Sequence, residues 1–346
     1  MKNKTAIWMS VTGAVLGAAW LGAHWLQTES LRNELAQPVE KMSLPSSRPR
    51  TVEKAVPVES KARKKALPSF LPPAAIQVAD ASLPYRDRIA ALKDFSLELA
   101  QADGRGLTAF LREARPEDKD AWQLALKNVV MDHLCASDAP GVRTLLADIF
   151  RDSGQNPVIR DYALQHLIEY AQLQTESGNR RGEFNEITEI LWEAVTETQN
   201  SIAGTALLGL SRLSETRPEI DRGEVADTAW QLAAEDNTGD LARTTAIQVC
   251  ASMNVTNALP AIRNLAQGGR TIPLQTSAIA ALGLLDDTAN AAWLRQLLEG
   301  DDDSLKPAAR RALARMQENE HQRQLELKEQ LERQELKQWK QKAGRI

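Results

Sequence analysis

The sequence predicts an all-α protein: an α–α superhelix of about six stacked helix pairs, with an N-terminal transmembrane helix and a long C-terminal polar helix. Three observations predict this class. Quartets of small and apolar residues recur at helical spacing, aromatic residues make up only 5% of the 346 residues, and no long window alternates apolar and polar residues. A core of Leu, Ala, Ile and Val suits helices, because Ala and Leu have high helix propensity.

Each quartet has i, i+3, i+4, i+7 spacing, which places its members on one buried stripe of a helix. The quartets begin at Ala163, Ala206, Ala246, Ala278 and Ala309, so they recur at intervals of 43, 40, 32 and 31 residues. Recurrence at such a period is the signature of stacked helical repeats. The residues predicted to form the repeat core are Ala163, Leu167, Ala206, Leu210, Ala246, Cys250, Ala278, Leu282, Ala309 and Leu313.

An apolar segment of 20 residues, Ile7 to Leu26, contains no Asp, Glu, Lys or Arg. A helix of this length spans about 30 Å, the thickness of a bilayer's hydrocarbon core. We therefore expect residues 1–27 to form a membrane anchor, with a cleaved signal peptide as the alternative. The anchor residues are Ile7, Trp8, Leu16, Trp20, Leu21, Trp25 and Leu26, the Trp residues lying near both ends as in an aromatic belt.

The charges flanking this segment predict how the chain is oriented. Lys2 and Lys4 favour a cytoplasmic N-terminus, which would place the body of the chain in the periplasm or outside the cell. If the segment is a signal peptide, the body would instead be secreted after cleavage.

Residues 28–83 are predicted to be a disordered tether. Eight of the 15 prolines fall between Pro38 and Pro84, and residues 27–65 carry nine Lys or Arg against five Asp or Glu. Such a composition buries too little apolar surface to offset the entropy of ordering the chain. Lys61, Arg63, Lys64 and Lys65 are a candidate contact for anionic lipid or an acidic partner.

Residues 84–316 are predicted to form the solenoid. A helix near 85–102 leads into pairs near 104–114 with 117–135, 140–152 with 156–174, 183–198 with 201–214, 222–235 with 239–253, 255–267 with 271–284, and 287–299 with 304–316. Asn156 before Pro157 is a capping side chain followed by the residue favoured at the first helical position.

The later repeats resemble a known family. They look like consecutive HEAT-type repeats of the armadillo-like α-solenoid family. The residues that carry this likeness are the run from Ala281 to Asp287, then Leu294, Leu297 and Leu298, and then Ala308, Ala309, Ala312 and Leu313. It is closest to the short HEAT-like repeat first associated with bilin-lyase proteins. The resemblance covers roughly residues 104–316 and is clearest after residue 239. It implies an α–α superhelix whose second helices line the inner face; it implies no ligand.

Residues 317–346 are predicted to continue the last helix as a charged segment. Glu329 with Arg333 and Lys328 with Glu332 are i, i+4 pairs that support a helix. Leu327 and Leu331 share a face, although Leu325, Leu336 and Trp339 do not continue a clean heptad. We therefore expect that this helix can form a coiled coil, either with a partner protein or with a second copy of the chain.

The sequence contains no catalytic, cofactor-binding or metal-binding constellation that we can recognise. It has four His and two Cys, with no HExxH, CxxC, GxxxxGK[ST], GxGxxG or GxSxG motif. HEAT-repeat enzymes that bind iron use His-Glu pairs, and no His-Glu dipeptide occurs here. Residues 66–346 carry a net charge of −10, which argues against nucleic acid as a partner.

We therefore expect a non-enzymatic scaffold or adaptor that is tethered to the membrane and binds protein in the cell envelope. Two alternatives remain at this stage: an accessory subunit of an envelope enzyme, and a self-associating structural component. Trp192, Trp230 and Trp293 all fall in first helices of the predicted pairs. They are expected to pack between repeats, unless they form an exposed aromatic ridge that binds peptide.

Overall fold

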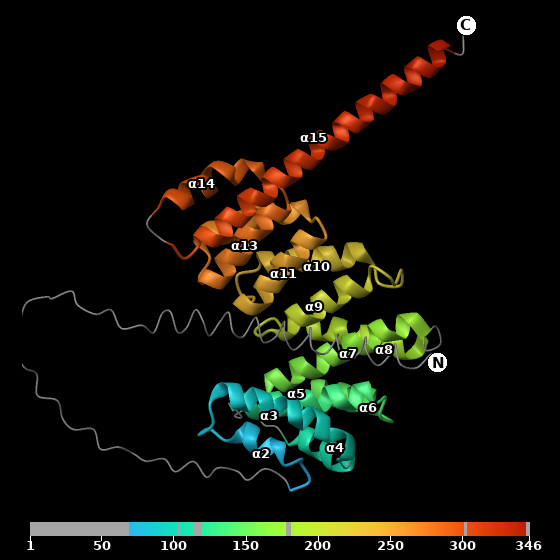
Figure 1. Cartoon of the computed structure of the whole chain (residues 1–346), viewed down its shortest axis with the longest axis vertical. Helices are drawn as coiled ribbons and strands as arrows, with labels where there is room; N and C mark the ends of the chain where they lie inside the picture. Colours follow the sequence, from blue (N-terminus) through green and yellow to red (C-terminus); the bar gives the residue numbers. More distant parts are fainter. Residues whose placement is uncertain (1–68, 103, 114–119, 178–180, 301–302, 344–346) are drawn as a thin grey trace, which may run out of the picture.

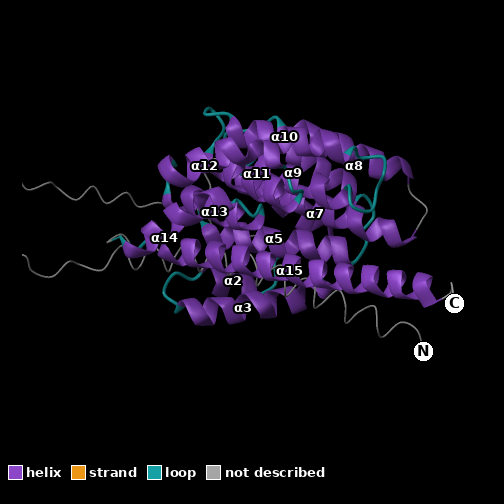
Figure 2. Cartoon of the chain, turned by 90° about the horizontal axis from the view of Figure 1, so that it is seen from above, coloured by secondary structure: helices purple, strands orange, loops and turns teal. Residues whose placement is uncertain are grey.

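The computed structural model describes residues 69–102, 104–113, 120–177, 181–300 and 303–343. Every regular element in these ranges is a helix, and no strand occurs among them (Figure 2). The helices stack along the long axis of the molecule in chain order, and the last one projects away from the stack (Figure 1). The protein is therefore an α-solenoid.

The helices form hairpins in which a first helix packs against the second helix that follows it. The hairpins are α2 (Ala74–Ala79) with α3 (Tyr85–Glu98), α4 (Gly104–Arg112) with α5 (Ala121–Ala136), α6 (Val142–Arg151) with α7 (Pro157–Ser177), α8 (Arg181–Val195) with α9 (Ile202–Leu213), α10 (Arg222–Ala234) with α11 (Asp240–Ser252), α12 (Leu259–Gly268) with α13 (Ile272–Leu284), and α14 (Ala291–Glu299) with α15 (Lys306–Ala343). Short 3₁₀ turns follow α3 and precede α12 and α14, at Leu99–Gln101, Thr256–Ala258 and Thr288–Asn290.

Side chains that are placed at the helix starts explain several of these boundaries. Asp120 accepts a hydrogen bond from the backbone N–H of Trp122 at 3.0 Å, and Asp221 accepts one from Gly223 at 2.7 Å. The Asn156 cap expected from the sequence is confirmed, because its Oδ1 accepts from the N–H of Val158 at 2.9 Å. Each cap satisfies an N–H group that the first turn of a helix leaves without a partner.

The second helices form one continuous layer. Helices α5, α7, α9, α11, α13 and α15 each pack against the next in this order, while contacts between successive first helices are few. Viewed from above, α10 and α12 lie to one side of α9, α11 and α13 (Figure 2). The stacking of repeats therefore depends mainly on the second helices.

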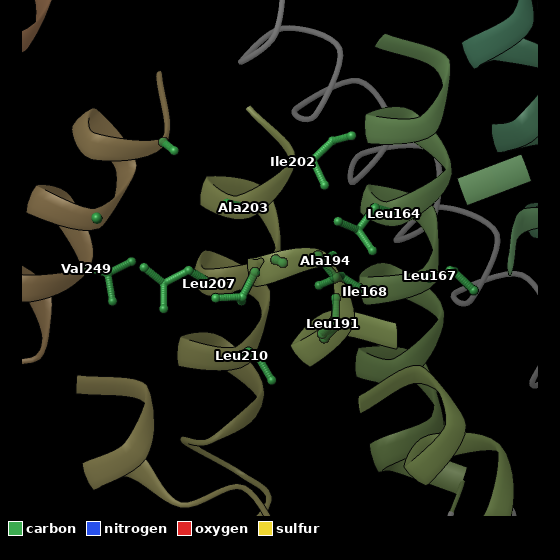
Figure 3. Close-up of a cluster of buried hydrophobic side chains, with 14 of the residues drawn as sticks. Leu164, Leu167, Ile168, Leu191, Ala194, Ile202, Ala203, Leu207, Leu210 and Val249 are labelled. Atoms are coloured by element: carbon green, nitrogen blue, oxygen red, sulfur yellow. The ribbon is translucent and has the colours of Figure 1, made fainter. Parts of the chain in front are cut away.

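Apolar side chains from neighbouring second helices meet between these helices. In Figure 3, Leu207 of α9 and Val249 of α11 point toward one another, and Leu164 and Ile168 of α7 lie beside Ala194 of α8. All five are buried. Because no hairpin covers its own stripe, each repeat depends on its neighbours to remove that surface from water.

Glycine lets these helices approach closely at three points. A Cβ added to Gly209 would lie 2.5 Å from Ile168 of α7, one added to Gly204 would lie 2.8 Å from Thr245 of α11, and one added to Gly283 would lie 2.7 Å from the Cα of Ala312. Side chains can yield at the first two positions, but at Gly283 the obstacle is the backbone of α15. The α13–α15 contact thus requires glycine at that position.

A basic side chain joins the two helices within four of the hairpins. Near the start of each second helix it donates to a carbonyl near the end of the first: Arg88 to Val78 at 2.7 Å, Lys127 to Phe110 at 2.5 Å, Arg160 to Phe150 at 2.6 Å, and Arg243 to Ala233 at 3.2 Å. We call this contact the hairpin latch. It satisfies carbonyls that the last turn of a helix leaves unpaired.

The first hairpin corrects the expected extent of the tether. The sequence predicts disorder through residue 83, but α2 lies within that stretch, with Ala75 and Val78 buried against the rest of the fold. Its latch, from Arg88, matches those of later repeats, so α2 and α3 form a seventh hairpin. The helix has six residues between Pro72-Pro73 and Pro84, which leaves too short a window for a periodic pattern.

The predicted membrane anchor, residues 7–26, lies outside the described residues, as does most of the predicted tether. Among the helices that the structure describes, none combines the length and the apolar character needed to cross a bilayer.

An ion pair also links successive repeats near the C-terminal end. Arg263 of α12 donates to both carboxylate oxygens of Asp287, at 2.8 and 2.6 Å, and Asn290 donates to the same carboxylate at 2.6 Å. The side chain of Asp287 is almost fully buried. These hydrogen bonds, led by that from Arg263, lower the pKa of Asp287 below its ordinary value.

We predict that Asp287→Asn destabilises the protein by about 1–2 kcal/mol at pH 7, because the guanidinium of Arg263 loses its charged partner. The native pKa of Asp287 is lowered, so the stability that it contributes is complete above the unfolded value, about 3.9, and is lost as pH falls through the native value. Urea unfolding at pH 7, 5 and 3 should show the difference from wild type shrinking only at pH 3. Asp227→Asn, an exposed carboxylate, is the control for loss of one charge. A difference that persists unchanged at pH 3 would contradict this assignment.

Gly283→Ala should destabilise the solenoid by about 1–3 kcal/mol, although alanine has the higher helix propensity, because α13 and α15 must move apart. Gly268→Ala is the matched control: it lies in the neighbouring helix α12, has no atom within 4 Å of an added Cβ, and should change stability by less than about 0.5 kcal/mol. Thermal unfolding of the two variants measures both. Equal melting temperatures would show that the second helices are not in close contact there.

Candidate interaction surface on the second helices

The second helices leave one side uncovered by the first helices, and we call this side the inner face. It is defined by two equivalent positions in each second helix, two and six residues after the first residue of the repeat quartet, or after the buried Val130 in α5. They are Asp132 and Ala136 on α5, Gln165 and Glu169 on α7, Leu208 and Arg212 on α9, Gln248 and Ser252 on α11, Ala280 and Leu284 on α13, and Arg311 and Arg315 on α15. All twelve are exposed or half-exposed, so this face is open along the stack.

The middle of the inner face, on α11 and α13, carries no charge. Helix α13 contains no charged residue. The two charged residues of α11 are engaged elsewhere: Arg243 forms its hairpin latch, and Asp240 accepts from Arg270 and Thr271 at 3.1 Å each. No charged side chain of these helices therefore lies on the face.

Large apolar side chains are exposed in this middle region. Leu241 at the start of α11 is 63% exposed, Leu284 at the end of α13 is 52% exposed, and Ile272 at the start of α13 is 40% exposed. Single exposed leucines are common on protein surfaces, but here they lie on adjacent helices without charge between them. Thr245, Thr276 and Gln248 supply hydrogen-bonding groups among them.

Charge is confined to the flanks of this region. On one side, Asp132 and Glu169 carry negative charge on α5 and α7, and Arg212 carries positive charge on α9. On the other side, Arg311 and Arg315 carry positive charge on α15, and Arg315 lies 2.8 Å from Glu318. Exposed apolar side chains with charged groups on both sides resemble the core and rim of a protein–protein interface.

The α5–α7 flank contains a hydrogen-bonded polar cluster. His166 Nε2 lies 3.0 Å from Asn128 Oδ1, and its Nδ1 lies 3.3 Å from Glu169 Oε2. His166 is thus a hydrogen-bonded histidine on the core stripe. Burial raises the pKa of the nearby Asp132, against the opposing effect of His166. The contact with Asn128 holds the His166 ring, so the cluster joins α5 and α7 at this flank of the inner face.

The two cysteines have no sign of a reactive role. Both are free, and burial is the main cause that raises the pKa of each thiol to about 12. A thiol of this pKa is protonated at neutral pH and is a poor nucleophile or metal ligand.

The structure places nine of the ten predicted core residues in the interior, and Leu313 is half-buried. Leu313 differs because it belongs to the last hairpin, which no further repeat covers. Of the three tryptophans, Trp192 and Trp293 pack against the core, and Trp230 on α10 is 40% exposed. They therefore do not form an exposed aromatic row. The predicted anchor residues, from Ile7 to Leu26, lie outside the described residues.

Within the described ranges, no group of three or more His, Cys, Asp or Glu side chains is arranged to hold a metal ion. Two hollows on the described part of the chain lie away from the inner face. One follows the turn from Ser214 to Arg222, and the other lies between α14 and α15, where it is lined by residues that include Arg295, Leu313 and His321. The second marks the open end of the stack.

No family model matches the sequence, and no curated protein is similar to it. Among solved structures, the chain is similar to human deoxyhypusine hydroxylase in complex with glycerol, with 16% identity over 71% of this chain and 95% of that one and a TM-score of 0.28. It is also similar to a designed armadillo repeat protein, with 12% identity over 71% of this chain and 99% of that one and a TM-score of 0.38. Both likenesses are distant, so the assignment of the solenoid rests on the helix packing described above.

Proposed function

We propose that this protein is a non-enzymatic scaffold, tethered to the membrane in the cell envelope, that binds another protein through its inner face. The observation that carries the proposal is the uncharged region on α11 and α13, in which Leu241 and Leu284 are exposed. An apolar centre with polar and charged flanks is the composition of a protein–protein interface. Stacked repeats present such a surface over a long distance, which suits them to hold an extended partner.

We assign the repeats to the HEAT type. The hairpin latch supports this assignment, because a basic residue occupies an equivalent place in α5, α7 and α11, three residues before a buried position of the core stripe. Lys306 occupies this place on α15, where it lies 2.7 Å from Asp303. The latch and the quartet together define a repeat with one buried stripe and one open face.

The membrane part of the proposal rests on the apolar segment from Ile7 to Leu26 and the basic residues Lys2 and Lys4. We expect the full chain to sediment with membranes and to resist an alkaline wash, and a chain that lacks residues 1–27 to be soluble. N-terminal mass determination distinguishes an anchor from a signal peptide, which would be absent from the mature protein. A full-length, uncleaved chain that remains soluble would contradict the tether.

Replacing both Leu241 and Leu284 with arginine should abolish partner binding without unfolding the protein, because both side chains are exposed and an arginine at each site places charge in the apolar region. A photo-crosslinking residue at Gln248 in cells of the native host reports binding. It lies between the two leucines, so it should form adducts in the wild-type chain and lose them in the double variant.

The matched controls use the other layer of the solenoid. Gln231 on α10 is exposed and belongs to a first helix. A crosslinker there should form few adducts, and Gln231→Arg should leave the Gln248 adducts unchanged. Adducts that persist in the folded double variant, or that depend on Gln231, would place the binding surface elsewhere.

A further inference from the structure

Helix α7 carries a buried carboxylate at its contact with α9. Asp161 lies near the start of α7 and is 8% exposed. Its Oδ2 accepts a hydrogen bond at 2.7 Å from the hydroxyl of Ser201, the residue that precedes α9. Its Oδ1 is buried and has no hydrogen-bond partner among the described residues. A carboxylate removed from water is stable as an anion only where hydrogen bonds or a cation replace its hydration.

The side chains that act on Asp161 are neutral. Ser201, Thr205 and Gln165 favour its charged form, but burial has the larger effect and raises the pKa of Asp161 above its ordinary value. The neighbouring Tyr162 stays protonated at neutral pH, because burial and the charge of Asp161 both raise the pKa of its phenol. Asp161 therefore has hydrogen-bond donors around it but no cation.

The charged groups of the surrounding helices do not neutralise this carboxylate. Arg160, the adjacent residue, donates to Glu197 at 2.8 Å and to the carbonyl of Phe150. Arg212 is the only charged residue of α9 and lies about three turns beyond Ser201. Where the structure describes side chains, the charged and titratable residues of the other helices packed against α7 are Lys127, Asp132, His133 and Cys135 on α5, Arg143, Asp148 and Arg151 on α6, and Glu186, Glu189 and Glu193 on α8. None of them is among the groups that act on the pKa of Asp161.

An acid at this place in the repeat occurs only on α7 among the second helices. The equivalent position, two residues before the quartet or before Val130 of α5, is occupied by Asn128 on α5, Gly204 on α9, Thr244 on α11, Thr276 on α13 and Pro307 on α15. Second helices therefore stack with a neutral residue at this position. The carboxylate of Asp161 is not required for stacking, so its effect on the α7–α9 contact calls for a separate explanation.

The contact between α7 and α9 differs along its length. Toward the end of α9, Gly209 packs closely against Ile168, since a Cβ added to Gly209 would lie 2.5 Å from the Cδ1 of Ile168. At the start of α9, the contact includes the hydrogen bond between Ser201 and Asp161. Gln165, one turn beyond Asp161, is half-exposed on the inner face. A small separation at this polar end would therefore let water reach the carboxylate, while the apolar end stays packed.

We propose that Asp161 is a pH-sensitive switch in the α7–α9 contact, which is closed when the carboxyl group is protonated and loosens at its polar end when the group ionises. A protonated carboxyl places no charge in the contact, whereas an ionised one is an anion that water stabilises better than this interior does. The packing of Gly209 against Ile168 is the same in both states, so the helices hinge there. This proposal concerns the fold alone and does not depend on the binding of a partner to the inner face.

The pH dependence of stability tests the switch. Because the native pKa of Asp161 is raised, the stability that it contributes is present below the unfolded value, about 3.9, and is lost as pH rises through the native value. Asp161→Asn stays neutral and gives α7 the residue that α5 has at this position. In urea unfolding of the full chain, its midpoint should exceed that of wild type at pH 8, and the two midpoints should converge as the pH falls to 4.

Two further variants accompany this measurement. Asp227→Asn removes an exposed carboxylate and should match wild type at every pH. Ser201→Ala removes the 2.7 Å hydrogen bond, which favours the charged form of Asp161, so it should lower the midpoint more at pH 8 than at pH 4.5. A midpoint for Asp161→Asn below wild type at pH 8, a difference that does not change with pH, or an equal loss in Ser201→Ala at both pH values would overturn the proposal.

Hydrogen exchange of the full chain shows where the contact loosens. After correction for the intrinsic pH dependence of exchange, the backbone amides of Thr205 and Ala206, in the second turn of α9, should be less protected at pH 8 than at pH 5 in wild type. In Asp161→Asn their protection should be the same at both pH values. Amides of α13 should not differ between the two chains. Equal protection at both pH values in wild type, or the same loss of protection in Asp161→Asn, would show that Asp161 does not control this contact.

Discussion

The contact between neighbouring second helices is the interaction on which the rest of the structure depends. Each hairpin buries one stripe of small and apolar residues, and neighbouring hairpins complete its cover. The free energy of a solenoid is the sum of such interfaces, so the loss of one contact weakens the repeats on both sides of it. Gly283 shows how close this contact is, because a methyl group attached to its Cα would collide with the backbone of α15. The hairpin latch and the Arg263–Asp287 pair fix the geometry within and between repeats but bury far less apolar surface.

The same contact determines which surface remains for function. Since the second helices use one side for the first helices and two sides for each other, only the inner face is left uncovered. Its middle is uncharged because α13 has no charged residues and α11 uses both of its own in contacts that hold repeats together. The apolar surface at Leu241 and Leu284 is thus neither part of the core nor a solvated polar surface. This is the physical basis for proposing a protein-binding scaffold.

Much of the fold can be predicted from the sequence because the quartets carry a clear period. The pairing of helices between 104 and 316 follows from their spacing, and Asn156 identifies a helix start directly. Helix α2 could not be predicted, because six residues between prolines carry no period. The hairpin latches could not be predicted either, because the spacing between donor and carbonyl is not fixed: 17 residues separate Lys127 from Phe110, whereas ten separate Arg160 from Phe150 and Arg243 from Ala233. The inner face was harder still: Leu282 and Leu284 are two residues apart in an almost wholly apolar helix, and only packing makes the first buried and the second exposed. Their positions relative to the quartet contain the signal that would have separated them.

Native-state hydrogen exchange followed residue by residue tests the continuity of the second-helix layer most directly. If the layer is one cooperative unit, backbone amides in α7, α9, α11 and α13 should share a single high protection against exchange. Those in the first helices should be less protected, and those in α15 beyond Arg323 should be the least protected. Amides of α9 and α11 that exchange as fast as those of α15 beyond Arg323 would contradict the account, because these helices could not then be holding successive repeats together.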